Sequence, residues 1–70
     1  MDYSTFTEEA LTLRLAEVRQ DHADLDAAIQ ALSASNVPDL VVIGRLKRKK
    51  LSLKDEIGRI LDQLNPDIIA

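Results

Sequence analysis

The sequence has no cysteine and a single histidine, His22. The lack of cysteine excludes disulfides and thiolate zinc sites, and one histidine argues against a closed zinc site within one chain. Only Tyr3 and Phe6 are aromatic, and both precede the region with helical periodicity, so we expect an aliphatic core. No apolar run approaches the ~18 residues of a membrane span, and no basic segment followed by an apolar stretch indicates a secretory signal. These absences favour a cytoplasmic protein without a cofactor.

The chain of 70 residues is long enough for one domain. A chain of this size buries only about 60% of the surface that it exposes when unfolded, so its core is marginal on its own. Small domains compensate with disulfides, a metal or oligomerisation. Because the composition argues against the first two, we expect a homo-oligomer, with a dimer favoured.

The first predicted helix covers about residues 6–35. Thr5 and Glu8 form a capping-box pattern, and Thr7 is a competing cap. Apolar positions then recur at alternating steps of 4 and 3, which is a heptad seam with one polar member. The positions of this first seam are Leu11, Leu15, Val18, His22, Leu25, Ile29 and Leu32.

A turn is predicted at residues 36–38. Asn36 can adopt a left-handed conformation at a helix end, and Pro38 suits the first turn of the following helix. The second predicted helix covers residues 39–64, and Asn65 with Pro66 ends it, leaving a short tail at 65–70. The positions of this second seam are Ile43, Leu46, Lys50, Leu53, Ile57, Ile60 and Leu64.

Two seams of similar length joined by a short turn predict an all-α, coiled-coil-like antiparallel hairpin of two helices, forming one domain over residues 1–70. Residues 8–36 hold six acidic and two basic side chains, a net charge of −4. Residues 39–64 hold four acidic and seven basic side chains, a net charge of +3. The charges therefore favour pairing of the two helices, and a second hairpin would complete a four-helix bundle.

The basic run at residues 45–50, continued by Lys54, suggests contact with phosphates, anionic lipid or an acidic partner. Helical geometry weakens this interpretation, because Lys47, Lys50 and Lys54 flank one side of the seam while Arg45 and Lys49 flank the other. No aromatic residue is interleaved for base stacking, and the chain carries a net charge of −3. A solvated surface that balances an acidic neighbour explains the run more simply.

His22 and Lys50 are the polar members of the two seams. His22 with Asp26 one turn away forms half of a conceivable metal site, which would need ligands from a second chain. The simpler interpretation is a polar layer in which the imidazole binds a carboxylate or water. Lys50 either fixes register and oligomeric state or packs its stem while its ammonium reaches water. The candidate interaction residues are His22, Asp26, Lys47, Lys50 and Lys54.

Gly44, Leu51 and Gly58 recur seven residues apart on one line of the second helix, beside the seam, and Leu40 lies close to this line. A glycine inside a helix costs about 1 kcal/mol relative to alanine. Close approach of another helix would explain two glycines on one line, so these four residues form a candidate oligomer face; chance tolerance of glycine is the alternative.

The pattern HxxLDxxI at residues 22–29 and the string LKRKKLSLKDEI at residues 46–57 resemble the YdcH-like family. These are small bacterial proteins assigned to a domain of unknown function, and the resemblance runs from about residue 11 to the end of the chain. It implies a helical hairpin that self-associates, and it brings no established activity, cofactor or catalytic residue.

We therefore predict a non-enzymatic protein-interaction or structural module. The alternative is a nucleic-acid-associated regulator that uses Lys47, Lys49, Lys50 and Lys54. A third hypothesis, a metal-dependent enzyme, would assemble around His22 across chains.

Overall fold

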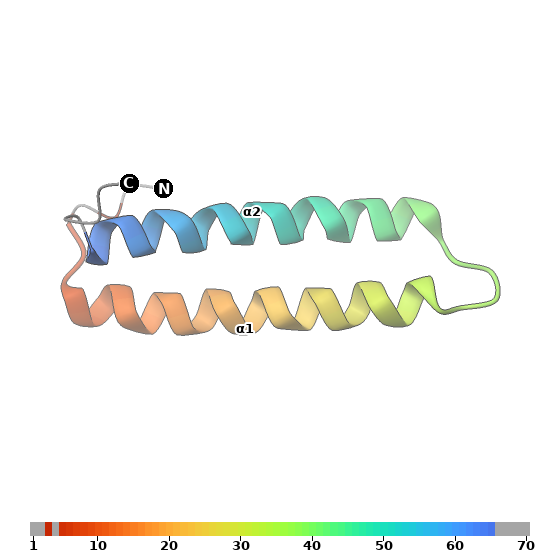
Figure 1. The fold of residues 1–70 in the computed structure, drawn as a ribbon, viewed down its shortest axis with the longest axis horizontal. Helices are drawn as coiled ribbons and strands as arrows, with labels where there is room; N and C mark the ends of the chain where they lie inside the picture. Colours follow the sequence, from red (N-terminus) through yellow and green to blue (C-terminus); the bar gives the residue numbers. More distant parts are fainter. Residues whose placement is uncertain (1–2, 4, 66–70) are drawn as a thin grey trace.

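The computed structural model describes residues 3 and 5–65 as two α-helices that lie side by side in opposite directions (Figure 1). Helix α1 spans Glu8–Ser33 and helix α2 spans Leu40–Leu64, and the described residues contain no strand. The molecule measures 47 × 24 × 18 Å. The structure thus confirms the predicted all-α antiparallel hairpin.

Helix α1 begins at Glu8 because Thr7 caps it. The Thr7 backbone is extended, and its hydroxyl oxygen accepts a hydrogen bond from the backbone N–H of Ala10 at 3.0 Å. Of the two predicted caps the structure selects Thr7, so α1 starts about two residues later than predicted. The residues before it turn back instead of continuing the helix, since the N–H of Phe6 donates to the carbonyl oxygen of Tyr3 at 3.0 Å.

The connection between the helices is longer than the predicted turn and occupies residues 34–39. Helix α1 ends at Ser33, and no described residue has a positive φ, so the left-handed conformation predicted for Asn36 is wrong. The carboxylate of Asp39 accepts hydrogen bonds from the N–H groups of Val41 and Val42, both at 3.1 Å. Asp39 is therefore the N-cap of α2, which places Pro38 before the helix and not in its first turn.

Every position of the two predicted seams is buried or half-buried. The tightest cluster lies at the end of the hairpin opposite the turn, where Leu11, Leu15, Val18 and Ile60 pack with Tyr3. Tyr3 is only 4% exposed, so the expectation of a purely aliphatic core is wrong. The ring of Tyr3, which lies before α1, is part of this core cluster, and the periodicity of the helices does not reveal this.

Packing weakens toward the turn. Near that end the buried side chains are Ile29 and Ile43, whereas Val37, Leu40 and Val41 are 72–86% exposed. No helix within residues 5–65 combines the length and the apolar character needed to cross a bilayer. Of the predicted tail, Asn65 alone is among the described residues; its N–H donates to the carbonyl oxygen of Leu61 at 2.9 Å.

Candidate functional site

Lys50 and Asp26 form an ion pair between the two helices near the middle of the hairpin. The Lys50 Nζ lies 2.5 Å from Asp26 Oδ1, and the other carboxylate oxygen accepts a hydrogen bond from Gln30 at 3.0 Å. The hydrogen bond from Lys50, reinforced by its charge, lowers the pKa of the Asp26 carboxyl. The ammonium group of Lys50, the polar member of the second seam, is thus paired with a carboxylate of α1 and does not only contact solvent.

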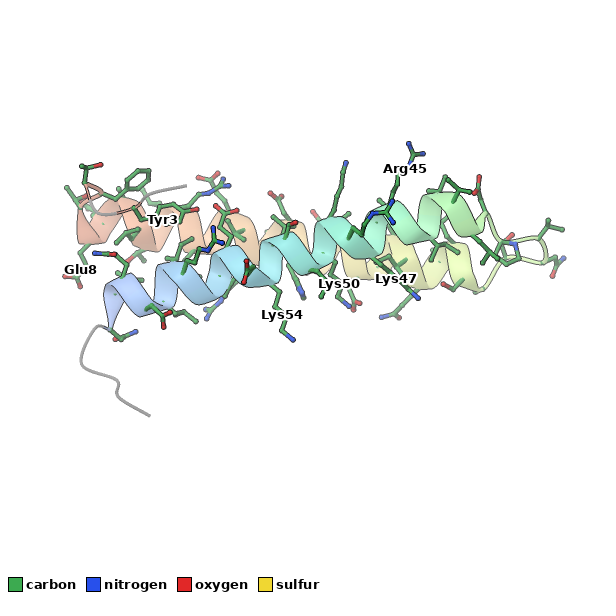
Figure 2. The ribbon with its side chains drawn as sticks, turned by 90° about the horizontal axis from the view of Figure 1, so that it is seen from above. Tyr3, Glu8, Arg45, Lys47, Lys50 and Lys54 are labelled. Atoms are coloured by element: carbon green, nitrogen blue, oxygen red, sulfur yellow. The ribbon has the colours of Figure 1, made fainter. Side chains whose placement is uncertain are left out.

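His22 lies on the same side of the hairpin. A shallow groove there is lined by His22, Lys47, Lys50, Leu51 and Lys54. We call the five predicted interaction residues, His22, Asp26, Lys47, Lys50 and Lys54, the lysine face. Figure 2 shows the labelled lysines Lys47, Lys50 and Lys54 along one edge of α2. The structure therefore brings the predicted interaction residues together on one side of the molecule.

Within one chain, the Asp26 carboxylate of the proposed metal half-site is already engaged by other side chains. Both oxygens of Asp26 already accept hydrogen bonds, from Lys50 and Gln30. Among the described residues, no group of three His, Cys, Asp or Glu side chains lies close enough to hold a metal ion.

The basic run is divided between the two broad sides of the hairpin. Arg45 lies on the opposite edge of α2 from Lys47, Lys50 and Lys54 (Figure 2). Lys49 also lies on the side of Arg45, where both line a different groove. No single strip of positive charge results, which is the distribution that helical geometry predicts.

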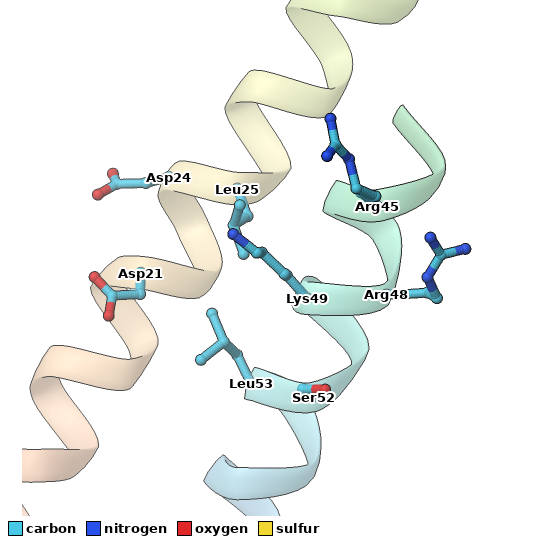
Figure 3. Close-up of a pocket in the computed structure, with 8 residues that line it drawn as sticks. All are labelled: Asp21, Asp24, Leu25, Arg45, Arg48, Lys49, Ser52 and Leu53. Carbon is cyan, nitrogen blue, oxygen red and sulfur yellow. The ribbon is translucent and has the colours of Figure 1, made fainter. Parts of the chain in front are cut away.

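This second groove runs between the helices and carries charges of opposite sign on its two edges. We call it the acid–base groove; its lining residues are Asp21, Asp24, Leu25, Arg45, Arg48, Lys49, Ser52 and Leu53. The acidic pair comes from α1 and the three basic side chains come from α2, with the half-buried Leu25 and Leu53 between them. Figure 3 shows Lys49 extending from α2 toward Leu25, and Arg48 pointing away from α1.

The leucine–glycine stripe, made up of Leu40, Gly44, Leu51 and Gly58, lies largely in solvent. Leu40 is 75% and Leu51 is 65% exposed. A Cβ atom added at Gly58 would meet nothing within 4 Å, and one at Gly44 would meet only the end of the Arg48 side chain, at 4.0 Å. No packing within the hairpin therefore requires glycine at either position, and the role of the stripe in an oligomer stays a prediction.

A polar cluster at the end opposite the turn joins the chain before α1 to both helices. The hydroxyl of Tyr3 donates to the carboxylate of Glu56, which also accepts from Arg14 Nε at 3.0 Å and lies 2.9 Å from Arg14 Nη2. Arg14 Nη1 lies 3.6 Å from the carboxylate of Glu17. The ring of Phe6 packs edge-on against Tyr3, with centroids 5.2 Å apart. We call Tyr3, Arg14 and Glu56 the tyrosine cluster.

Ionisation in the tyrosine cluster favours a neutral tyrosine between charged partners. Burial, followed by the hydrogen bond to Glu56, raises the pKa of the Tyr3 hydroxyl. Burial alone would raise the pKa of the Glu56 carboxyl, but hydrogen bonds from Tyr3 and Arg14 outweigh it, so this pKa is lowered. The hydrogen bond to Glu56 raises the pKa of Arg14. Near neutral pH the cluster therefore links Tyr3 to both helices through a charged Glu56 and a charged Arg14.

Sequence reasoning missed the tyrosine cluster and the acid–base groove. Asp55 and Arg59, one turn apart on α2, form an ion pair at 3.3 Å, but the neighbouring Glu56 reaches across to α1. The Arg14–Glu56 pair could have been inferred from the positions of the two residues, because each flanks a seam, where charged side chains of facing helices meet.

The fold and its surfaces define the class of protein as a two-helix hairpin with charged grooves on its broad sides. A family model described as "Protein of unknown function (DUF465)" matches residues 15–61. The match covers more than half of the chain, so the chain belongs to this family. YdcH is a member of the same family, so the match confirms the resemblance seen in the sequence. Neither a curated protein nor a solved structure matches the chain.

Proposed function

We propose that this chain is a non-enzymatic hairpin that self-associates into a dimer of four helices and serves as a protein-interaction or structural module in the cytoplasm. A hairpin of two helices has one packed side per helix, so its remaining apolar surface is covered only by another molecule. The observation that carries the proposal is the amount of surface that the single chain leaves exposed.

The hairpin exposes more surface than a compact monomer of its mass. Its accessible surface is 5395 Å², whereas a compact folded monomer of 7.8 kDa exposes about 4,400 Å². Its radius of gyration is 15.0 Å, compared with about 11 Å for a compact domain of this length. The excess of roughly 1,000 Å² is similar to the ~800 Å² that each partner buries in a standard interface.

Exposed apolar side chains also support self-association. Leu13 on α1 is 64% exposed, and Leu40, Val41 and Leu51 on α2 are 65–75% exposed. Single exposed leucines are ordinary, but here they accompany a core with few fully buried side chains. Burial of apolar side chains between two copies would stabilise both hairpins.

The non-enzymatic part of the proposal is supported by the surroundings of His22, the one histidine of the chain. It shares its groove with Lys47, Lys50 and Lys54, and no serine, threonine or cysteine lines that groove. The nucleic-acid alternative is less well supported, because the basic run is divided between two sides and Lys50 is already paired with Asp26.

Sedimentation velocity over a range of concentrations from about 1 to 100 μM tests the proposal. We expect a species of twice the 7.8 kDa chain mass that dissociates on dilution, with loss of helical circular dichroism as it does so. A well-folded monomer throughout this range would rule out self-association as the basis of function.

A further inference from the structure

The charges along the acid–base groove form no ion pair with any other side chain that the structure describes. The four ion pairs among the described residues join Arg14 to Glu17 and Glu56, Lys50 to Asp26, and Arg59 to Asp55. None of them uses Asp21 and Asp24 on the edge formed by α1, or Arg45, Arg48 and Lys49 on the edge formed by α2. The groove thus offers one acidic edge and one basic edge, with apolar side chains between.

A surface with edges of opposite charge is complementary to itself in one orientation. Two copies packed face to face are related by a two-fold axis that lies in the interface. If this axis runs along the helices, both turns lie at the same end, and α1 of each copy packs against α2 of the other. If the axis runs across the helices, the turns lie at opposite ends, and α1 packs against α1.

Only the first orientation brings unlike charges together. It places the acidic edge of each copy against the basic edge of the other. Each residue keeps its position along the hairpin axis, because the two-fold axis runs parallel to the helices. The Lys50–Asp26 pair sets the relative positions of the two helices along the hairpin axis. Asp24 of one copy is therefore offset along that axis from Lys49 of its partner by three residues, about 4.5 Å, which the long lysine side chain spans. The second orientation places acid against acid and base against base, which is unfavourable.

We propose that a second copy of this chain docks on the acid–base groove with its turn at the same end. This inference rests on the self-association proposed above and adds the interface and its direction. Leu25 and Leu53, both half-buried in the hairpin, become the apolar centre of the interface. The charged edges supply orientation and specificity, while apolar burial supplies most of the affinity.

The position of the two turns gives the first test. The chain has no cysteine, so Asn36→Cys provides one labelling site in the exposed connection. Pulsed electron paramagnetic resonance on the spin-labelled protein then measures the distance between the two turns. Same-end docking predicts a separation of roughly 10–25 Å, from an interhelical spacing of 8–10 Å plus the label arms. Opposite-end docking predicts a separation close to the 47 Å length of the hairpin.

Charge reversal gives the second test. The variants Asp21→Lys/Asp24→Lys and Arg45→Glu/Lys49→Glu each place like charges across the proposed interface. We expect either variant alone to raise the dimer dissociation constant by at least about tenfold, and their mixture to restore a heterodimer. The matched control is Lys47→Glu/Lys54→Glu, which changes the charge of α2 by the same amount on the lysine face.

The outcomes separate this inference from the proposed function. A wild-type protein that stays monomeric overturns both. A dimer with a long distance between the turns, or one weakened equally by the control, overturns the docking on this groove but leaves self-association standing. A dimer weakened by Leu51→Gln in the leucine–glycine stripe and not by the groove variants also overturns it. Circular dichroism of each variant, and rescue in the mixture, distinguish loss of docking from loss of folding.

Discussion

Removing the side chain of Tyr3 should destabilise the hairpin clearly more than removing the neighbouring ring of Phe6. Tyr3 is 4% exposed and packs with Leu11, Leu15 and Ile60 at the end opposite the turn. Its hydroxyl donates to the Glu56 carboxylate, which also binds Arg14. The residue therefore contributes both apolar burial and a charge-assisted hydrogen bond.

The two contributions can be separated by size. Tyr3→Ala removes about 150–250 Å² of buried aromatic surface, or about 4–6 kcal/mol at 25 cal/mol per Å². A domain of 70 residues has a total stability of about 3.5–10 kcal/mol. Tyr3→Phe keeps the ring and loses one hydrogen bond to a carboxylate that retains Arg14, so we expect a loss of about 1–2 kcal/mol. Each kcal/mol corresponds to about 4–8 °C in the melting temperature.

Thermal and urea unfolding followed by circular dichroism measures both variants at one fixed protein concentration, because any association would shift the midpoint. The matched control is Phe6→Ala, which removes the neighbouring ring; Phe6 is 40% exposed, so its loss should cost clearly less. If Tyr3→Ala lowered stability no more than Phe6→Ala, the packing of the tyrosine against the helix ends would be refuted.

Three further results are expected. The Glu56 carboxyl has a lowered pKa in the folded state, so its contribution is complete above the unfolded value of about 4.3 and is lost as the pH falls through the folded value. The drop in stability between about pH 5 and 3 should therefore be smaller in Glu56→Gln, and an unchanged drop would contradict the cluster. Replacing Lys50, which is half-buried in the second seam, with leucine should raise the melting temperature by a few degrees or change the oligomeric state in sedimentation; if neither changes, Lys50 is only a surface residue. Gly58→Ala should stabilise the hairpin by about 1 kcal/mol, because its Cβ meets nothing within 4 Å; a loss of dimer instead would assign the leucine–glycine stripe to the interface.

The seams could be predicted from the sequence because burial follows the period of the helix. The steps between apolar positions run 4, 3, 4, 3, 4, 3 along the first seam and repeat when the second seam is read backwards. Two antiparallel helices with matching steps bury each other along their length. The same geometry predicted that Lys47 and Lys49 point to different sides of α2, and the two lysines line different grooves.

The tyrosine cluster and the connection could not be predicted in this way, because neither follows a helical period. Tyr3 precedes the first helix, and the backbone N–H of Phe6 donates to its carbonyl oxygen in a turn that lies outside any helical period. At the connection, either Pro38 or Asp39 could have preceded the first residue of α2. The Asp39 carboxylate accepts hydrogen bonds from two backbone N–H groups, so Asp39 is the N-cap and α2 begins after it. The exact start of a helix depends on such local hydrogen bonds, which the spacing of apolar residues does not predict.

The acid–base groove was hidden for a different reason. Asp21 and Asp24 lie on α1 and Lys49 lies on α2, so their relation appears only once the register of the hairpin is known. The charge totals of the two helices indicated attraction between them, but several of these charges form no ion pair in the described part of the chain. Net charge indicates that helices attract, whereas register decides which charges are left for a second molecule.

Small-angle X-ray scattering on the wild-type chain at micromolar concentration tests the central claim most directly, because it gives mass and length together. Side-by-side pairing of two hairpins predicts twice the mass of the 7.8 kDa chain with a longest dimension still close to 47 Å. A particle of single-chain mass at every concentration, or a dimer with nearly doubled length, would contradict the account.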